Sequence, residues 1–227
     1  MIRDNLNSVR DRIEKAAARA GRDAGEVVLV CVTKEADTEG IREVIDGGIT
    51  DIGENTVQSV AEKYKSFGSS GVRWHFIGHL QTNKAKTAVG IFDLIHSVDS
   101  IHLAEAIQKE AEKIHKMQSI LLQVNVSGEK SKYGLAPKDT ADAVGVVSGM
   151  KNLMLLGLMT IAPYSDNPED ARQYFKALKN MRDELSRRNC DNVDIKHLSM
   201  GMSGDFEAAI EEGADIVRIG SAIFGGH

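Results

Sequence analysis

The sequence predicts an α/β fold, namely a single (β/α)8 barrel of the TIM type with an extra helix at the N-terminus. Short apolar runs alternate with longer helical segments about eight times, at a period of roughly 25 to 30 residues, which is the pattern of repeated βα units. The first of these runs, 27–33, is almost entirely apolar and rich in β-branched residues, as is typical of a parallel strand buried on both faces. An open doubly wound sheet is the alternative, but the number of strands favours a closed barrel.

Amphipathic spacing and glycine stops define the predicted helices. Apolar residues from Leu6 to Ala17 recur on one face of the first helix, and Gly21 ends it. A long helix late in the chain carries an apolar stripe from Tyr174 to Leu185. We expect helices over residues 5–20, 38–46, 57–67, 83–89, 101–116, 136–147, 168–187 and 221–224, and one that begins near residue 203.

The predicted strands are short, mostly apolar runs bounded by polar or glycine-containing turns. They cover residues 27–33, 50–55, 72–78, 94–98, 120–126, 153–161, 195–200 and 216–220. Low-complexity and proline-rich spacers are absent from the sequence, so we expect residues 1–227 to form one domain.

Composition narrows the classes of partner. The chain has 227 residues, of which 42% are hydrophobic, and a net charge of -5, which argues against a nucleic-acid surface. Cys31 and Cys190 lie far apart and suggest reduced thiols rather than a disulfide or zinc site. The N-terminus is polar, and no apolar run reaches the roughly 18 residues that a membrane span needs. We therefore expect a cytoplasmic monomer that binds neither nucleic acid nor membranes.

Lys34 stands at the carboxyl end of the first predicted strand, where α/β folds place their chemistry. Burial of a lysine stem disfavours the ammonium form, so the neutral amine becomes available to attack a carbonyl and form a Schiff base. The alternative is that Lys34 simply extends to solvent from the barrel mouth.

Two glycine- and serine-rich turns suggest an anion site. Residues 199–205 follow the seventh predicted strand, and residues 220–222 follow the eighth. Barrels often bind phosphate between these two loops, although each turn alone is also compatible with an ordinary serine-capped helix start. A phosphate site opposite a strand-end lysine points to a phosphorylated aldehyde.

Metal binding is not indicated. His75 and His79 flank the third predicted strand, but their spacing does not aim both rings at one metal, and no carboxylate accompanies them. The charged loop 127–134 is either a mobile flap over the barrel mouth or a solvated surface loop.

Several segments, taken together, resemble the pyridoxal phosphate homeostasis protein family, also called the proline synthetase co-transcribed family. The matching segments run through nearly the whole chain in the family's order and are residues 32–34, 53–55, 74–84, 123–125, 157–159, 198–203 and 217–225. The resemblance extends to the alanine racemase barrel, the fold type III class of pyridoxal phosphate (PLP) proteins. It implies PLP as the cofactor, with Lys34 forming the internal aldimine, Asn55 near the ring and Arg218 facing the pyridine nitrogen. It further implies a phosphate site lined by Ser199, Gly201, Ser203, Gly220 and Ser221.

One departure from the family concerns the residues after Lys34. Members commonly continue with Thr or Gln, a basic or polar residue, and Pro, whereas this chain reads Glu35-Ala36-Asp37. A second lysine two positions on, which some members have, is missing. Any mechanism that passes the cofactor between two lysines at this place is therefore in doubt, whereas bonding to Lys34 is unaffected.

The resemblance favours PLP homeostasis and carriage, without catalytic residues, over turnover. A guanidinium only donates, so Arg218 would keep the ring nitrogen unprotonated and make the ring a poor electron sink. A racemase needs a second positioned group, and because the sequence ends at His227 we expect no further domain to bring one; only Tyr133 and Tyr164 are expected near the mouth. We expect apo-PLP enzymes as transient recipients. A PLP-dependent racemase and a Schiff-base aldolase acting on a phosphorylated substrate are the alternatives.

Overall fold

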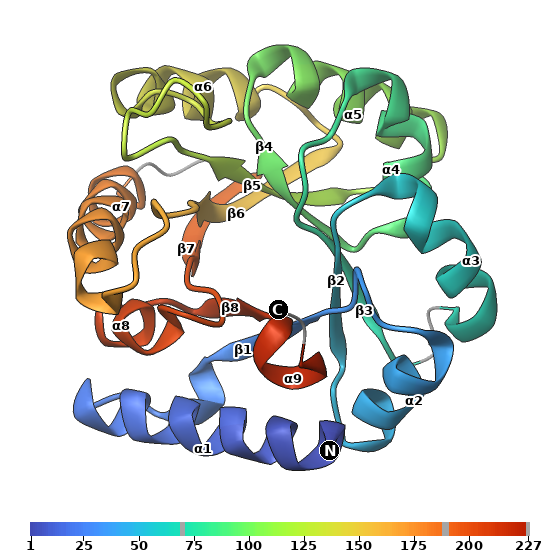
Figure 1. Cartoon of the computed structure of the whole chain (residues 1–227). Helices are drawn as coiled ribbons and strands as arrows, with labels where there is room; N and C mark the ends of the chain where they lie inside the picture. Colours follow the sequence, from blue (N-terminus) through green and yellow to red (C-terminus); the bar gives the residue numbers. More distant parts are fainter. Residues whose placement is uncertain (69–70, 188–190, 226–227) are drawn as a thin grey trace.

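The chain folds into the predicted barrel. The computed structural model describes residues 1–68, 71–187 and 191–225, in which eight parallel strands close in sequence order, β1 pairing with both β2 and β8 (Figure 1). The strands are β1 (Val28–Val32), β2 (Asp51–Glu54), β3 (Arg73–Phe76), β4 (Leu94–Val98), β5 (Gln118–Gln123), β6 (Leu153–Met159), β7 (Val193–Ser199) and β8 (Ile216–Ile219).

Helices surround the barrel, and the N-terminal helix takes the place of the helix that normally follows the last strand of such a barrel. The helices are α1 (Ile2–Arg19), α2 (Thr38–Asp46), α3 (Val57–Phe67), α4 (Ala85–Ile91), α5 (Ile101–Lys113), α6 (Thr140–Val147), α7 (Arg172–Leu185), α8 (Phe206–Glu211) and α9 (Ser221–Phe224). Because α9 is a single turn, it leaves the outside of β8 and β1 uncovered. The extra helix α1 packs there, between α8 and α2, as Figure 1 shows. The N-terminal helix thus completes the ring.

The main departure from the predicted elements lies after β7. A helix was expected to begin near residue 203, but α8 begins at Phe206. The Asp205 carboxylate accepts a hydrogen bond from the backbone N–H of Met202 at 2.6 Å, which closes residues 202–205 into a turn ahead of the helix. The N–H groups of Asp205 and Phe206 both donate to the Met202 carbonyl within this turn.

The helices expected to start near residues 83, 136 and 168 each begin with one turn of 3-10 helix. These turns are η2 (Thr82–Lys84), η3 (Pro137–Asp139) and η4 (Pro168–Ala171), and a fourth, η1 (Ala24–Glu26), precedes β1. Prolines at the first position of η3 and η4 suit a helix start because their missing N–H would be unpaired there.

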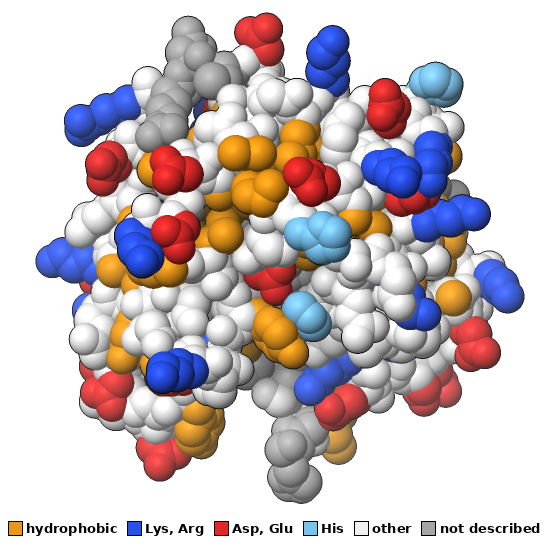
Figure 2. All heavy atoms as spheres, turned by 90° about the horizontal axis from the view of Figure 1, so that it is seen from above, with side chains coloured by type: hydrophobic (Ala, Val, Ile, Leu, Met, Phe, Trp, Pro, Cys, Tyr) orange, Lys and Arg blue, Asp and Glu red, His pale blue; other side chains and the backbone are white. Residues whose placement is uncertain are grey.

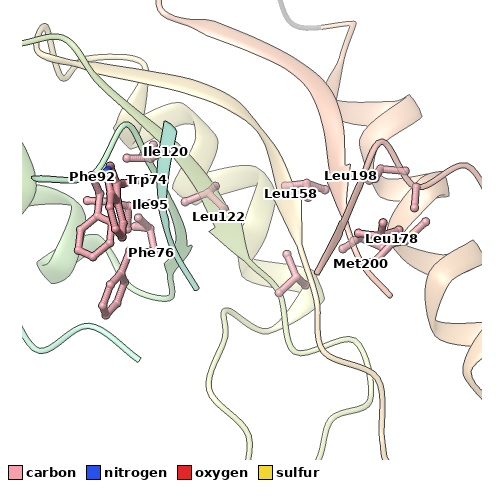
Figure 3. Packing of buried hydrophobic residues seen from close by; sticks show 14 of the residues in the cluster. Trp74, Phe76, Phe92, Ile95, Ile120, Leu122, Leu158, Leu178, Leu198 and Met200 are labelled. Atoms are coloured by element: carbon pink, nitrogen blue, oxygen red, sulfur yellow. The ribbon is translucent and has the colours of Figure 1, made fainter. Parts of the chain in front are cut away.

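Alternation along the strands separates two cores. Outward side chains such as Trp74 and Phe76 of β3 pack under the helices (Figure 3). The ring of Phe76 lies 5.0 Å from that of Phe92, the residue after α4, edge to face. Inward side chains form a smaller apolar group inside the barrel, comprising Val30, Leu94, Leu121, Met159 and Ile216. The rest of the barrel interior is polar, and this polar part lies next to the site described below.

Side chains of both charge signs are interspersed over the face in Figure 2. Within the described residues, no helix is long and apolar enough to cross a membrane. Cys31 is buried and unpaired, and burial raises the pKa of its thiol to about 12; Cys190 lies outside the described residues.

Candidate functional site

A cavity of about 650 Å³ opens at the carboxyl ends of the strands. That volume lies within the usual range for small-molecule sites, and this end of the barrel is where such sites occur. Six of the eight predicted binding residues line the cavity, namely Lys34, Asn55, Ser203, Arg218, Gly220 and Ser221. The fold therefore brings together side chains that are as far as 187 positions apart in sequence, from residue 34 to residue 221.

Lys34 lies two residues after the last residue of β1, Val32, and its amine lies 3.2 Å from the carboxylate of Glu35. Its side chain is 52% exposed, so the apolar wall that the sequence suggested does not enclose it. Of the two interpretations that the sequence left open, the structure agrees with a lysine that extends to solvent from the barrel mouth. Asp37, the other acidic residue of the unusual segment, caps α2 by accepting a hydrogen bond from Gly40 at 2.8 Å.

A buried ion pair supports the end of β1 from behind. The Glu54 side chain is fully buried between β2 and α3, where it accepts hydrogen bonds from Thr33 at 2.5 Å and from Lys63 at 2.8 Å. Lys63 also donates to the backbone carbonyl of Thr33 at 2.6 Å. The residue before Lys34 is thus fixed through both its side chain and its backbone. The sequence gave no signal for this pairing, because nothing local relates a strand end to a lysine nine residues later.

The two loops predicted to bind an anion lie side by side. The backbone N–H of Ala222 donates to the Ser203 hydroxyl at 3.3 Å, which ties the loop after β7 to the start of α9. Within the described chain, the backbone N–H groups of Ser203, Gly204 and Ser221 have no hydrogen-bond acceptor. A side chain added at Gly204 would meet no atom within 4 Å. Free amides, serine hydroxyls and open space together form a cradle of the kind that binds phosphate.

Ser199 and Gly201 take different positions from the one the resemblance implied. Neither is among the residues that line the cavity. Gly201 has φ +93°, and a Cβ there would lie 2.6 Å from the Cβ of Ala209 and 2.9 Å from the Cα of Phe206. Only glycine fits this turn. Ser199 is completely buried inside the barrel.

Arg218 points from β8 into the floor of the cavity. It is 4% exposed, and it donates to the Ser199 hydroxyl at 2.6 Å and to the Thr160 carbonyl at 2.9 Å. Burial lowers the pKa of its guanidinium to about 10, and the charge of Asp205 opposes the shift. Arg218 therefore stays cationic near neutral pH, with further N–H groups unused by the two bonds named.

Asn55 follows β2, and its position depends on close contact with the loop after β3. A Cβ on Gly78 would collide with the Asn55 carbonyl, so this approach requires glycine. The Asn55 side-chain amide has no partner in the described part of the chain.

The lining also includes Lys132, which the sequence did not single out, and Tyr164, which was expected near the mouth. Lys132 reaches the cavity from the loop 127–134, donating to the Ile161 carbonyl at 3.4 Å. Tyr164 stands at the rim, 91% exposed, and its hydroxyl donates to Asp166 at 2.9 Å. For Lys132, the charged loop 127–134 gave no local signal as to which of its side chains would reach the cavity. Tyr133 does not line the cavity but stacks on His79, with ring centroids 3.7 Å apart.

The two histidines considered for metal binding lie apart. His75 is inside the barrel, whereas His79 is near the surface, with its ring 3.1 Å from the Asp99 carboxylate. Among the described residues, no group of three or more His, Cys, Asp or Glu side chains is placed to hold a metal ion.

Comparison with known proteins assigns the chain to a family. Residues 5–227 match the family described as alanine racemase, N-terminal domain. A pyridoxal phosphate homeostasis protein from Aquifex aeolicus is 47% identical over 98% of this chain and 96% of its own length. The chain belongs to the pyridoxal phosphate homeostasis protein family. The Escherichia coli K12 member is 38% identical over 99% of this chain and 96% of its own length.

Solved structures agree with this family assignment. PipY from Synechococcus elongatus, determined with PLP bound, superposes with a TM-score of 0.86 at 31% identity, covering 99% of this chain and all of PipY. The resemblance stated from the sequence motifs is therefore confirmed.

Proposed function

We propose that this protein binds PLP in the cavity at the barrel mouth and serves PLP homeostasis and carriage rather than turnover. A single observation carries the proposal: the amine of Lys34 and a cradle of amide and hydroxyl donors face the same cavity. The names of the relatives and the PLP in PipY point to the same ligand. In this proposal residues 1–227 act as one cofactor-binding domain.

In this proposal the cradle binds the phosphate group of PLP. Ser203, Gly220 and Ser221 would contact it, with Gly220 closely packed on β1, where a Cβ would lie 3.1 Å from the Val32 carbonyl. Ser199 and Gly201 would shape the cradle from beneath. Lys34, Lys132 and Arg218 outnumber the carboxylates of Glu35 and Asp205 along the lining, which suits an anionic ligand.

Lys34 would react with the aldehyde group of PLP. Its neutral amine would add to the aldehyde carbon, and a C=N bond would replace the C=O bond with loss of one water, giving a Schiff base. Asn55 would lie beside the ring, and Arg218 would donate to the pyridine nitrogen without protonating it. PLP supplies the electron sink for amino acid chemistry when it is protonated on that nitrogen, and Arg218 opposes this state.

Two features favour carriage over turnover. Lys34 is half exposed in an open cavity, which permits entry and release of the ligand. Proton exchange at an amino acid α-carbon needs two positioned groups, and the tyrosine that lines the cavity, Tyr164, is 91% exposed with its hydroxyl bonded to Asp166. We further propose that the protein acts in the cytoplasm as a monomer and passes PLP to apo-enzymes.

The test is an absorbance spectrum combined with chemical trapping. Protein mixed with PLP should turn yellow, and borohydride should fix the label on Lys34, as located by peptide mass spectrometry. Lys34→Ala should abolish the colour, whereas Lys132→Ala, which removes another cavity lysine, should keep it. A label on any other lysine in the wild-type protein would contradict the assignment.

A second measurement separates carrier from racemase. In D2O, the holo-protein should exchange the α-proton of either alanine isomer no faster than free PLP does, yet it should restore activity to an apo-PLP enzyme. Exchange of either isomer above that of free PLP, lost in Lys34→Ala, would refute the carrier proposal.

A further inference from the structure

A chain of polar side chains runs through the barrel interior beneath the cavity. Its members come from different strands, namely Ser199 from β7, His96 from β4, His75 from β3 and Asp51 from β2, and we call these four residues the polar chain. Each is at most 5% exposed. The interior of such a barrel is usually packed with branched apolar residues, and buried polar groups are costly unless they are hydrogen-bonded. Their presence here therefore calls for a physical role.

Every link of the polar chain is within hydrogen-bond distance. Ser199 Oγ lies 2.8 Å from His96 Nδ1, His96 Nε2 lies 2.8 Å from His75 Nδ1, and His75 Nε2 lies 2.9 Å from Asp51 Oδ1. The upper end meets the cavity, because Arg218 Nη1 donates to Ser199 Oγ at 2.6 Å. The chain thus connects the cavity floor to the opposite end of the barrel.

The donors and acceptors of the polar chain have one consistent direction. Arg218 can only donate, so the Ser199 oxygen accepts from it and the serine proton goes to His96 Nδ1. His96 then carries its proton on Nε2 and donates to His75 Nδ1. His75 in turn carries its proton on Nε2 and donates to the Asp51 carboxylate. All four imidazole nitrogens are satisfied with both rings neutral.

The charges around the polar chain hold it in this state. Burial lowers the pKa of His96 well below 6.5, and the positive charge of Arg218 lowers it further. At the lower end, burial tends to raise the pKa of Asp51, but hydrogen bonds from His75, Arg73 and Thr50 outweigh it and lower the value to about 2. A fixed carboxylate therefore terminates the chain at one end, and a fixed guanidinium at the other.

We propose that the polar chain positions Arg218, holding the guanidinium in the orientation that presents its remaining N–H groups to the ring of a ligand in the cavity. A serine hydroxyl alone can rotate and offers a poorly defined acceptor. With its proton committed to His96, the Ser199 oxygen has its lone pairs directed at Arg218. This assignment rests on the proposed function for the identity of the ligand, whereas the geometry of Arg218 can be tested without any ligand.

The first test uses the ligand-free protein. Nitrogen-15 NMR of wild-type protein at neutral pH should show both His96 and His75 protonated on Nε2 only. Solvent exchange of the Arg218 Nη1 protons, which bond Ser199, should be about tenfold faster in His96→Leu and near wild type in His96→Gln, whose amide can both accept and donate. Leu121→Ala, which disturbs the apolar part of the barrel interior, is the matched control and should leave that exchange unchanged.

The second test uses ligands. His96→Leu should raise the dissociation constant of PLP about tenfold. Inorganic phosphate, which would occupy the cradle alone, should compete with the same inhibition constant as in the wild-type protein. His96→Gln should restore PLP binding. If His96→Leu weakened the binding of PLP and of phosphate equally, the polar chain would have a structural role only, and the positioning role would be refuted.

Failure of the positioning role and failure of the proposed function can be distinguished. A doubly protonated histidine, or Arg218 exchange that His96→Leu leaves unchanged, would overturn the positioning role whether or not PLP binds. Failure of wild-type protein to bind PLP would instead refute the proposed function, and the NMR result would still decide the role of the polar chain.

Discussion

Replacing Lys63 with methionine should destabilise the protein strongly, because it would leave the Glu54 carboxylate buried without its countercharge. The Glu54 side chain is 0% exposed and that of Lys63 only 14%, and the amine lies 2.8 Å from the carboxylate. Breaking a buried pair from one side costs about 3–5 kcal/mol. The hydroxyls of Thr33 and Ser59 would still donate to Glu54, so we expect the lower end, about 3 kcal/mol.

That loss can be measured by urea denaturation and by thermal unfolding. For a chain of this size about 3 kcal/mol corresponds to a fall in Tm of roughly 6–12 °C. Lys65→Met is the matched control, since Lys65 lies on the same helix, exposed to solvent, and should cost less than about 0.5 kcal/mol. Adding Glu54→Gln to Lys63→Met should recover part of the loss by removing the unpaired charge. Equal stability of Lys63→Met and Lys65→Met would refute the reasoning.

Three further outcomes follow from other buried groups. Asp51→Asn should lower the free energy of unfolding by about 2 kcal/mol at pH 7, because folding lowers the pKa of Asp51 from 3.8 to about 2. The carboxylate contributes its full stabilisation above pH 3.8, so the difference in unfolding free energy between wild type and variant should disappear as the pH falls through about 2. In a Cys190→Ser background, Cys31 should resist alkylation at pH 8 until the protein is unfolded, and rapid labelling of native protein would contradict its burial. Gly201→Ala should lower the unfolding free energy by about 2 kcal/mol in urea titrations, whereas Gly204→Ala, with open space around it, should not; equal losses would refute the steric argument.

The strands and the position of Lys34 could be predicted because their signals are local. A β-branched run such as 27–33 indicates a buried strand wherever it occurs, and the residue that follows it must lie at the carboxyl end. The start of α8 could not be placed, because the turn before it depends on the Asp205 side chain bonding back to Met202. Within this turn the N–H groups of Asp205 and Phe206 bond the Met202 carbonyl, whereas those of Ser203 and Gly204 have no acceptor in the described chain.

The sequence left the exposure of Lys34 open between two interpretations for a related reason. The sequence showed an apolar run leading into the lysine, but burial depends on what the neighbouring loops bring over the barrel mouth. Those loops leave the side chain 52% exposed and supply Glu35 as its partner. The family resemblance identified the residue without establishing its environment, since a motif specifies side chains and not the surfaces around them.

The polar residues inside the barrel show most clearly where sequence reasoning ends. His75, His96 and Ser199 each occupy an inward position of a strand, which alternation along that strand can predict. Whether three such side chains come within hydrogen-bond distance depends on the stagger between strands that are not neighbours in sequence. This stagger is a property of the closed barrel. A polar residue that looks like a defect in its own strand thus becomes, after closure, one link of a fully paired chain ending at Arg218. The rigid strands therefore supply the fixed charge at the cavity floor, while the loops supply the groups that must admit and release a ligand.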